Sequence, residues 1–396
     1  MEKAMESTRA SERIGSLYER ANRLLSAMRS ELADDINEKT LEVRFSVRQA
    51  AELVGRSETS IRRAEDEGSL PSPARRPSGH RLGYSLEDIN KMRDFFGTRP
   101  WRAESDDPII LGVQNFKGGV GKSTLSVHAA QYFALQGYRV LLIDADPQAS
   151  TTSMLGIHPE RDISAHDTLL PFIEGEHDTL AYAVRSTYWD GLDLIPACLG
   201  LYDAEYIIAG GQSQEGQAER FDYIKNGLFD IQHAYDLIVI DPPPALGMIS
   251  LNVLRATNAL LVPTPPSSID YASTVSFLSM LSAVLGQLEK RGILAQYKFV
   301  QLVATKVNEN KSAHLGMRDA MKDVFGSEIL STALLDSAEF DNANVDMRTI
   351  YEYAGASNST YKRCRSNLDK VLGDLEMAVR NAWPSHRRGL RRQGVA

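Results

Sequence analysis

The chain has 396 residues, a formal net charge of −8 and a hydrophobic content of 43%. This length allows more than one domain, and the composition is typical of a folded globular protein rather than a disordered chain. The two cysteines, Cys198 and Cys364, have no CxxC or Cys/His neighbours, which argues against a disulfide framework, structural zinc and a paired-ligand iron–sulfur cluster. The polar N-terminus is unlike a signal peptide and no apolar run reaches the length of a membrane span, so we expect a cytoplasmic protein.

Positive charge collects towards the two ends of this acidic chain. Residues 44–102 hold 12 lysines and arginines against 8 acidic residues. The C-terminus carries Arg387, Arg388, Arg391 and Arg392. This distribution suits a protein that contacts DNA through its ends and has another activity between them, although an ordinary solvated surface explains the tail equally well.

The first periodic segment predicts an amphipathic helix over residues 10–36. Its apolar side chains recur every three or four positions and form one stripe: Ile14, Leu17, Ala21, Leu24, Met28, Leu32 and Ile36. A lone helix cannot bury such a stripe, so it must pack either on a second subunit, as a dimerisation helix, or on its own chain.

The following segment predicts a helix-turn-helix. Ser46 can cap a short helix that ends at the Gly55 turn, and Ser57 can cap a second helix that ends near Gly68. Prolines and arginines then form a turn-rich wing before a third helix, Leu86 to Phe96.

The second helix and the wing carry the groups expected to contact DNA. Short polar and cationic side chains on a recognition helix can reach base edges and phosphates. The candidates are Ser57, Thr59, Ser60, Arg62 and Arg63 on the helix and Arg75, Arg76 and Arg81 in the wing. Through the runs Val47 to Gly55, Arg62-Arg63, Glu67 to Pro71, Gly79-His80-Arg81 and Tyr84-Ser85, the segment resembles the MerR-like winged helix-turn-helix.

A glycine-rich loop between a strand and a helix is the most informative feature of the chain. The apolar run Ile109 to Val113 precedes this loop, and the amphipathic segment Leu125 to Leu135 follows it. Gly118, Gly119 and Gly121 can turn their backbone N–H groups towards phosphate oxygens at a helix N-terminus. The sequence therefore predicts a phosphate-binding loop.

The other residues of the loop complete a Walker A motif. Lys122 would reach the β- and γ-phosphates, and Ser123 would offer its hydroxyl to Mg²⁺. Lys117 places a further cation directly before the double glycine. The predicted nucleotide-binding residues here are Lys117, Gly118, Gly119, Val120, Gly121, Lys122, Ser123 and Thr124.

Two further apolar strands end in carboxylates. The run Val140 to Ile143 leads into Asp144 and Asp146, and the run Leu237 to Ile240 leads into Asp241. Ligands gather beyond the carboxyl ends of parallel strands, so these carboxylates should lie beside the phosphates, with Asp241 as the Walker B residue. A surface aspartate that ends a strand would explain one such feature but not three in order.

These motifs, Lys117 to Thr124, Asp144 to Gln148 and Asp241-Pro242-Pro243, resemble the deviant-Walker-A ATPases of the ParA/MinD group. With a helix and a winged helix-turn-helix in front, the chain is similar to the type Ia ParA proteins of plasmid partition, in particular the RepA members of repABC cassettes. The resemblance implies an α/β fold, a P-loop ATPase domain with a doubly wound, mostly parallel sheet. The expected domains are an N-terminal helix over 1–42, the winged domain over 43–99, a linker over 100–108 and the ATPase domain with its basic tail over 109–396.

The resemblance also implies roles for individual residues. Lys122 would bind the nucleotide phosphates, Lys117 would cross a dimer interface to the nucleotide of the other subunit, and Asp146 would orient the attacking water. ATP would then hold the dimer together, and hydrolysis would be slow because positioning and charge neutralisation replace a strong base. The expected metal-binding residues are Ser123, Asp144 and Asp241, of which Asp241 also counts among the nucleotide-binding residues.

Three later features extend these expectations. The loop from Val262 to Asp270 is a candidate switch, with a plain structural turn as the alternative. Asn308, which follows the strand Phe299 to Ala304, is a candidate adenine contact. By the resemblance, Arg348, Lys362, Arg363 and Arg365 would grip DNA non-specifically through phosphate contacts that weaken with salt.

The last periodic segment predicts a helix with one apolar face, formed by Leu368, Val371, Leu372, Leu375, Val379 and Trp383. The arginines that follow allow a membrane-targeting helix. Asp369, Asp374 and Glu376 dilute the cationic face, however, and this favours a helix packed on the ATPase core.

These features together indicate ATP-dependent partition of a plasmid by a cytoplasmic, nucleoid-associated homodimer without membrane binding. A ParB-like centromere-binding partner would stimulate hydrolysis, and the winged domain would bind operator DNA and repress the protein's own operon. The alternative is a nucleotide-regulated transcription repressor without a segregation role. A metal-cluster or reductase-type ATPase is disfavoured, because the two cysteines have no pairing pattern.

Overall fold

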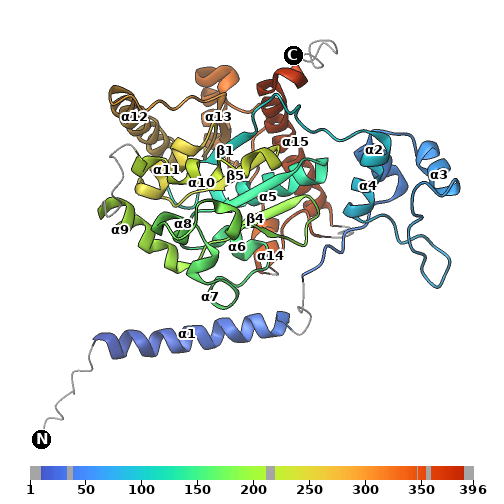
Figure 1. Ribbon diagram of the computed structural model, residues 1–396, viewed down its shortest axis with the longest axis horizontal. Helices are drawn as coiled ribbons and strands as arrows, with labels where there is room; N and C mark the ends of the chain where they lie inside the picture. Colours follow the sequence, from blue (N-terminus) through green and yellow to red (C-terminus); the bar gives the residue numbers. More distant parts are fainter. Residues whose placement is uncertain (1–9, 34–38, 211–218, 346, 354–357, 388–396) are drawn as a thin grey trace, which may run out of the picture. The chain divides into compact units, whose positions relative to one another are not determined.

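The computed structural model describes residues 10–33, 39–210, 219–345, 347–353 and 358–387, and it divides into two units, Met1–Thr40 and Leu41–Ala396. The first unit contains α1, Ala10–Ala33, which confirms the predicted N-terminal helix (Figure 1). Ile14, Leu17 and Leu24 of the predicted stripe are exposed, whereas Ile36 lies outside the described residues.

Three short helices open the second unit, and each begins where the sequence predicts. Ser46, Ser57 and Ser85 each accept a hydrogen bond from the backbone N–H three residues further on. Gly55 and Gly97 end the first and third helices in the left-handed conformation. The helices are α2 Val47–Val54, α3 Glu58–Asp66 and α4 Leu86–Phe96.

A small hairpin connects α3 to α4. The Arg76 N–H donates to the His80 carbonyl at 2.8 Å, and an antiparallel bridge pairs Arg75 with Arg81. The hairpin stands where the sequence predicts the wing. We call residues 41–97 the α2–α4 region.

In the described part of the second unit, seven strands form one sheet in the order β3-β4-β2-β5-β1-β6-β7 (Figure 1). All neighbours are parallel except β3, which pairs antiparallel with β4 at one edge. The predicted doubly wound, mostly parallel α/β fold is confirmed. The strands are β1 Ile109–Val113, β2 Val140–Asp144, β3 Arg185–Ser186, β4 Leu192–Ile195, β5 Leu237–Asp241, β6 Ala259–Thr264 and β7 Phe299–Ala304.

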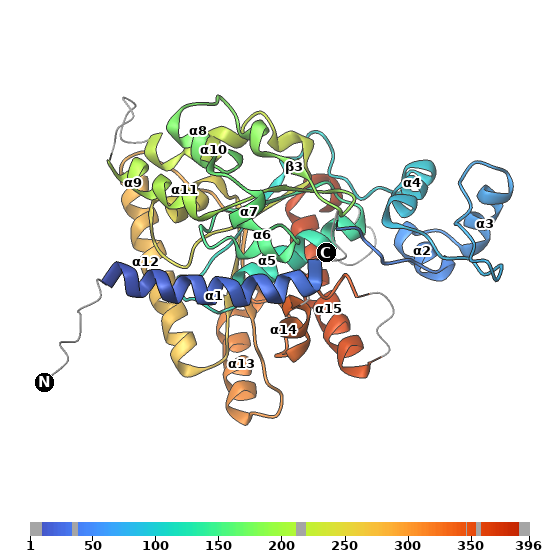
Figure 2. The same ribbon diagram turned by 90° about the horizontal axis from the view of Figure 1, so that it is seen from below.

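Helices cover both faces of this sheet (Figures 1 and 2). Because successive side chains on a strand point to opposite faces, Leu111 and Val239 join the core beneath α5 and α15, while Ile110 and Ile240 join the core beneath α8 to α11. A third core lies around β6 and β7 beneath α12 and α13. The helices of this domain are α5 Lys122–Gln136, α6 Ser150–Met154, α7 Pro159–Asp162, α8 Leu170–Glu174, α9 Tyr202–Gly210, α10 Tyr223–Leu228, α11 Met248–Ala256, α12 Ser268–Lys290, α13 Ser312–Phe325, α14 Ala338–Val345 and α15 Ser359–Ala382.

The C-terminal helix α15 packs on the ATPase core as the sequence favours. All six side chains of its predicted apolar face are completely buried: Leu368, Val371, Leu372, Leu375, Val379 and Trp383. This face is covered by the protein itself and is not available to a membrane.

Helix α12 corrects one expectation. The sequence analysis predicts no apolar run of membrane-spanning length, yet α12 has that length, and its mean hydropathy reaches 1.3 over 18 residues. Serines interrupt the apolar run, but no charged residue lies between Asp270 and Glu289. Phe277 and Leu281 pack into the third core, so the helix is a partly buried element of the fold.

The predicted linker, residues 100–108, rests on the ATPase domain. The Trp101 ring lies between the guanidinium groups of Arg99 and Arg139, at 5.3 and 4.6 Å, and its Nε1 donates to the Gly137 carbonyl at 3.0 Å. Arg102 is buried and donates to the Tyr235 carbonyl at 3.2 Å. These contacts attach the connection between the α2–α4 region and the sheet.

Candidate nucleotide and DNA sites

The glycine-rich loop turns between β1 and α5 and leaves open space above the start of the helix. Gly119 and Gly121 have φ angles of 74° and 99°, the left-handed region that favours glycine. A Cβ atom placed on Gly118, Gly119 or Gly121 would meet no atom within 4 Å. The exposed N-terminus of α5 is therefore free to receive an anion such as a phosphate.

Lys122, the first residue of α5, is a buried cation. Its side chain is 6% exposed, and its ammonium donates to the Lys117 carbonyl at 3.4 Å. Burial lowers the pKa of Lys122, while the charges of Asp241 and Asp146 act in the opposite direction. A buried cation held by one carbonyl favours an anionic ligand beside it.

Two carboxylates stand side by side at the carboxyl ends of neighbouring strands. Asp144 of β2 pairs with Asp241 of β5 in the sheet register, and both are fully buried. Asp241 accepts hydrogen bonds from the hydroxyls of Thr151, at 2.7 Å, and Ser126, at 3.2 Å. The Thr152 hydroxyl donates to Asp144 at 2.7 Å. Hydroxyl donors thus hold both carboxylates in place.

Burial and nearby negative charges make both carboxylates reluctant to ionise. Burial, with the charge of Asp241 adding to it, raises the pKa of Asp144 well above its ordinary value. Burial raises the pKa of Asp241 to about 6, although Thr151, Ser123 and Lys122 act to lower it. A cation bound next to the pair would relieve this repulsion.

The donor set fits Mg²⁺ bound together with a nucleotide. Mg²⁺ takes oxygen ligands, usually one or two carboxylates completed by phosphates and waters. Asp144, Asp241 and the Ser123 hydroxyl, which hydrogen-bonds to Asp241, supply such oxygens. Within the described residues no group of three or more His, Cys, Asp or Glu could hold a metal by itself, which agrees with an ion held partly by its nucleotide.

Lys117 forms an ion pair with Asp270 of its own chain. About a third of the Lys117 side chain is exposed, and Asp270 lies in the first turn of α12. Burial acts to raise the pKa of Asp270, but hydrogen bonds from Lys117 and Ser267 outweigh it and lower the pKa. The lysine is thus held at the rim of the loop by a carboxylate that the sequence analysis places in the candidate switch without a role.

Residues that the sequence analysis did not select also shape the loop. Asn115 accepts from the Lys117 N–H at 3.1 Å, and its amide donates to the Pro263 carbonyl at 2.9 Å. The Thr305 hydroxyl, at the end of β7, donates to the Val120 carbonyl at 2.9 Å. Polar side chains at strand ends, and the threonines that follow Asp144 and Asp146, are a sequence signal by which such residues could be found. Their hydrogen-bond partners could not be predicted, because these depend on the order of strands in the sheet.

The two remaining candidates lie at the same edge of the sheet. Asn308 follows β7, and its side-chain oxygen accepts from the Asn310 N–H at 3.0 Å in a local turn. Residues 262–264 of the candidate switch belong to β6, so the connection to α12 is short. A contact of Asn308 with adenine and a switching role of this loop remain predictions.

The candidate DNA-binding residues of α3 lie at its exposed start and outer face. Ser57 caps the helix, and its hydroxyl lies 2.8 Å from that of Ser60. Thr59, Arg62 and Arg63 are exposed. Arg63 pairs with Glu67 at 2.7 Å and Arg62 with Glu58 at 4.0 Å, both along the helix surface.

Arg81 has a structural partner that the sequence analysis does not foresee. It forms an ion pair at 2.7 Å with Glu65 of α3, whose side chain is completely buried. The Tyr84 hydroxyl donates to the same carboxylate at 2.6 Å. Arg81 therefore fastens the hairpin to α3, whereas Arg75 and Arg76 are exposed.

Three of the four C-terminal DNA candidates are engaged within the protein. Arg348 pairs with Glu42 at 3.6 Å and Arg363 with Glu309 at 2.7 Å, and the Arg365 guanidinium lies 4.8 Å from the centre of the Tyr351 ring. Lys362 is exposed. Arg388, Arg391 and Arg392 of the basic tail lie outside the described residues.

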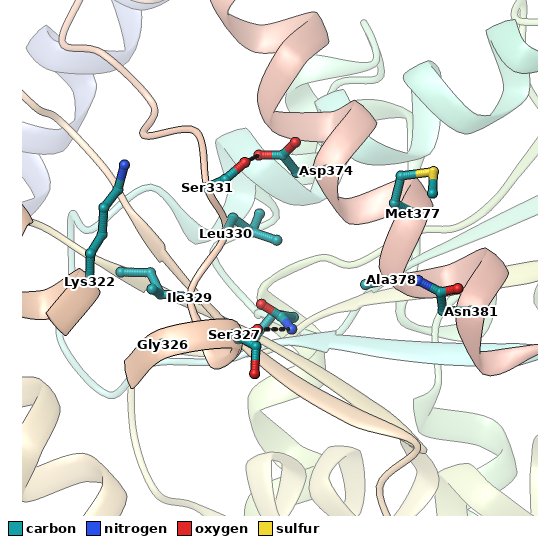
Figure 3. A pocket seen from close by; sticks show the side chains of 11 residues that line it. Lys322, Gly326, Ser327, Ile329, Leu330, Ser331, Asp374, Met377, Ala378 and Asn381 are labelled. Atoms are coloured by element: carbon teal, nitrogen blue, oxygen red, sulfur yellow. Dashed lines mark hydrogen bonds between the residues drawn. The ribbon is translucent and has the colours of Figure 1, made fainter. Parts of the chain in front are cut away.

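A groove at the β7 edge of the sheet is separate from these sites (Figure 3). Its lining comes from β7, the end of α13, the following turn and α15, and includes Lys322, Leu330 and Asp374. Asp374 accepts from the Ser331 hydroxyl at 2.6 Å, which joins α15 to the turn. None of the predicted site residues lines this groove.

The parallel sheet, the phosphate loop at the start of α5 and the carboxylates at the ends of β2 and β5 define a P-loop ATPase. The family model described as "AAA domain" matches residues 109–291. The solved structure entitled "Partition Protein" matches with a TM-score of 0.63 at 21% identity, over 93% of this chain and 99% of that one, which supports the fold.

Two curated relatives narrow the family. Protein SopA of Escherichia coli K12 is 39% identical over 351 residues, which cover 86% of this chain and 89% of that protein. The replication protein A of Rhizobium rhizogenes is 31% identical over 353 residues, which cover 86% and 87%. The chain belongs to the ParA family of plasmid partition ATPases, and its cofactors are ATP or ADP with Mg²⁺.

Proposed function

We propose that this ATPase partitions a plasmid as a nucleotide-dependent homodimer. The observation that carries the proposal is the position of Lys117, a partly exposed cation at the rim of the phosphate loop. Within its own subunit its ammonium pairs with Asp270, whereas Lys122 already lies at the bottom of the loop. In the ATP-bound dimer Lys117 leaves Asp270 and binds the phosphates of the other subunit.

The residues of the site suggest slow hydrolysis by positioning and charge neutralisation. The loop N–H groups and Lys122 bind the phosphates, and Ser123, Asp144 and Asp241 would hold Mg²⁺, which would supply charge neutralisation at the phosphate oxygens. Asp146 is 8% exposed and accepts from the Gln148 N–H at 3.0 Å, a fixed position from which it orients the attacking water. A ParB-like centromere-binding partner accelerates this step and releases the dimer.

Two surfaces serve the two kinds of DNA contact. The α2–α4 region acts as a winged helix-turn-helix that binds operator DNA through Ser57, Thr59, Ser60, Arg62, Arg63, Arg75 and Arg76 and represses the protein's own operon. The ATP dimer binds nucleoid DNA without sequence preference through Lys362 and its neighbouring arginines, after these exchange their carboxylate partners for phosphates. The protein thereby resides in the cytoplasm on the nucleoid.

Helix α1 provides a second dimer contact. Its exposed side chains Ile14, Leu17 and Leu24 are 66, 54 and 66% exposed and recur at helical spacing. A stripe of this kind gains about 25 cal/mol for each Å² of apolar surface that a second copy covers.

The experiment that tests the proposal measures binding of the purified protein to random-sequence DNA and to the DNA upstream of its own gene, with ADP and with a non-hydrolysable ATP analogue. Partition with autorepression is supported if the protein binds random DNA only in the presence of the ATP analogue and binds the upstream DNA in the presence of ADP. The control is Lys117→Gln, which should lose binding to random DNA. Binding of upstream DNA alone, under every condition, would instead identify a nucleotide-regulated repressor without a segregation role.

A further inference from the structure

Arg93 of α4 is a completely buried cation at the junction of the α2–α4 region with the ATPase domain. Its Nε and Nη2 donate to the Leu53 carbonyl at 3.2 and 3.1 Å, and Nη2 also donates to the Leu135 carbonyl at 2.7 Å. Nη1 donates to the Asn90 side chain at 2.7 Å. Among the described residues no carboxylate lies within ion-pair distance of Arg93; its hydrogen-bond acceptors are neutral oxygens, and the charges of Asp190, Asp94 and Glu376 act on it from further away. Burial lowers the pKa of Arg93 to about 10, which leaves the guanidinium charged at neutral pH.

Both carbonyls belong to the last turns of helices. Leu53 is the next-to-last residue of α2, and Leu135 is the next-to-last residue of α5. The last four carbonyls of a helix lack partners within the helix and carry its negative dipole end, so a single cation stabilises both termini. One side chain therefore joins the first helix of the predicted helix-turn-helix to the helix that begins with Lys122.

The surroundings of Arg93 make this contact specific. A Cβ placed on Gly137 would lie 2.8 Å from Nη1 of Arg93, so glycine leaves room for the guanidinium. Asn90, which accepts from Arg93, donates to Asp190 at 2.6 Å. Buried residues of α4 and of α5 belong to one continuous core.

Helix α5 thus has the phosphate loop at one end and Arg93 at the other. Its 15 residues span about 22 Å at 1.5 Å per residue. The helix is buried along most of its surface. If phosphate binding moves the loop, this helix connects the movement to the Leu135 carbonyl, and through Arg93 to α2.

We propose that Arg93 is a positioning residue that couples the nucleotide site to the α2–α4 region. The proposal rests on operator binding by that region, as proposed above. With Arg93 in place, the nucleotide bound at the start of α5 determines the position of α2 and α3. This position determines the affinity for operator DNA. By linkage, operator DNA changes the affinity for the nucleotide by the same factor.

The test compares the full-length protein with Arg93→Lys and Arg93→Gln. Operator dissociation constants are measured with ADP and with a non-hydrolysable ATP analogue, and nucleotide dissociation constants are measured with and without operator DNA. In the unmodified protein we expect the operator dissociation constants measured with the two nucleotides to differ by a factor of about five or more, the size of ordinary allosteric coupling. In both variants the ratio should fall to about one, with basal ATP hydrolysis retained, because lysine cannot bridge two carbonyls with a planar fork.

The matched control is Arg99→Gln. Arg99 lies in the same junction and pairs with Asp94 at 2.7 Å, but within the described residues it does not contact α2. This variant should keep the coupling ratio. Loss of the ratio in Arg99→Gln as well would show that any weakening of the junction suffices and would overturn the specific role of Arg93.

Hydrogen exchange, compared between the unmodified protein and Arg93→Lys, gives a readout that does not need the operator. The ATP analogue should change the exchange of backbone amides in α2 and α3, and Arg93→Lys should abolish that change. An absence of any change in α2 and α3 overturns the inference, and so does a full change in the folded variant. If the exchange changes but no operator is bound, the proposed repressor function fails while the coupling through Arg93 stands.

Discussion

The nucleotide site and the α2–α4 region treat buried charge in opposite ways. The nucleotide site keeps two buried carboxylates with raised pKa values side by side, next to a buried lysine whose ammonium donates to one backbone carbonyl. The α2–α4 region buries one carboxylate and one cation and satisfies both: Glu65 with Arg81 and Tyr84, and Arg93 with backbone carbonyls and Asn90. The first arrangement is complete only with a metal and a phosphate, while the second is complete without a ligand.

This difference indicates where ligand binding should stabilise the protein. A bound MgATP neutralises groups that otherwise repel one another, so it should raise stability strongly. In the proposed complexes, DNA would contact surface cations that already have carboxylate partners, such as Arg63 with Glu67, and would have to compete with these carboxylates. We therefore expect the affinity for DNA to fall steeply as the salt concentration rises. We expect bound DNA to stabilise the folded protein less than MgATP does.

The largest expected effect is that of Asp241→Asn. Hydrolysis should fall about 100-fold or more, because the site loses a metal-binding carboxylate. The melting temperature of the nucleotide-free protein should rise, because the repulsion between Asp144 and Asp241 disappears while the Thr151 hydroxyl keeps an oxygen to donate to. Steady-state kinetics measures the expected loss of hydrolysis, and thermal unfolding measures the expected rise in melting temperature. A lower melting temperature would contradict the idea that this site is strained without its ligands.

Lys117→Gln should abolish the ATP-specific dimer while nucleotide binding by one subunit changes less than about threefold, since Lys122 still reaches the phosphates. Analytical ultracentrifugation with ADP and with the ATP analogue measures the dimer. The matched variant is Asp270→Asn, which frees Lys117 from its partner in the same chain and should leave the dimer intact or stronger. An ATP dimer in Lys117→Gln would refute the role of this lysine across the interface.

Glu65→Gln in α3 and Glu67→Gln at the C-cap of α3 compare a buried ion pair with an exposed one. Glu65→Gln should destabilise the α2–α4 region by about 3 kcal/mol, because Arg81 loses a buried partner. It should also weaken operator binding. Glu67→Gln should leave stability nearly unchanged, because water screens this surface pair. Equal effects in chemical denaturation would remove the distinction between the two pairs.

The smallest expected effect concerns pH. His128 of α5 lies 2.6 Å from the Thr124 carbonyl through Nδ1 and accepts from the Ile350 N–H through Nε2, so burial keeps it neutral and lowers its pKa from 6.5 to about 4. The unfolded chain binds the extra proton first, so this contribution to stability is complete above pH 6.5 and is lost as the pH falls towards 4. At pH 5 the loss is about 2 kcal/mol.

The measurement compares urea unfolding of the unmodified protein and of His128→Gln at pH 7 and pH 5. The difference between the two proteins isolates the histidine from the carboxylates that also titrate. An identical pH dependence in both proteins would show that His128 does not titrate as proposed.

Much of the fold and the core of the site could be predicted from the sequence, because the relevant signals are local. The strands β1 and β7 and the helix α4 begin and end where the apolar runs and serine caps place them. The glycines of the loop and the aspartates at the ends of β2 and β5 can be recognised in the sequence because each follows an apolar strand. A parallel sheet then has to bring them to one edge, since the carboxyl ends of its strands meet there.

The tertiary structure alone decided which distant groups meet. Asp270 pairs with a lysine about 150 residues earlier, Arg81 pairs with Glu65 of α3, and Arg93 donates to the last turns of both α2 and α5. These pairs follow from strand order and from the docking of α4 on α5. Short-range propensity and periodicity contain no information about either, because they describe one element at a time, whereas the partner of a buried charge is set by the element packed against it.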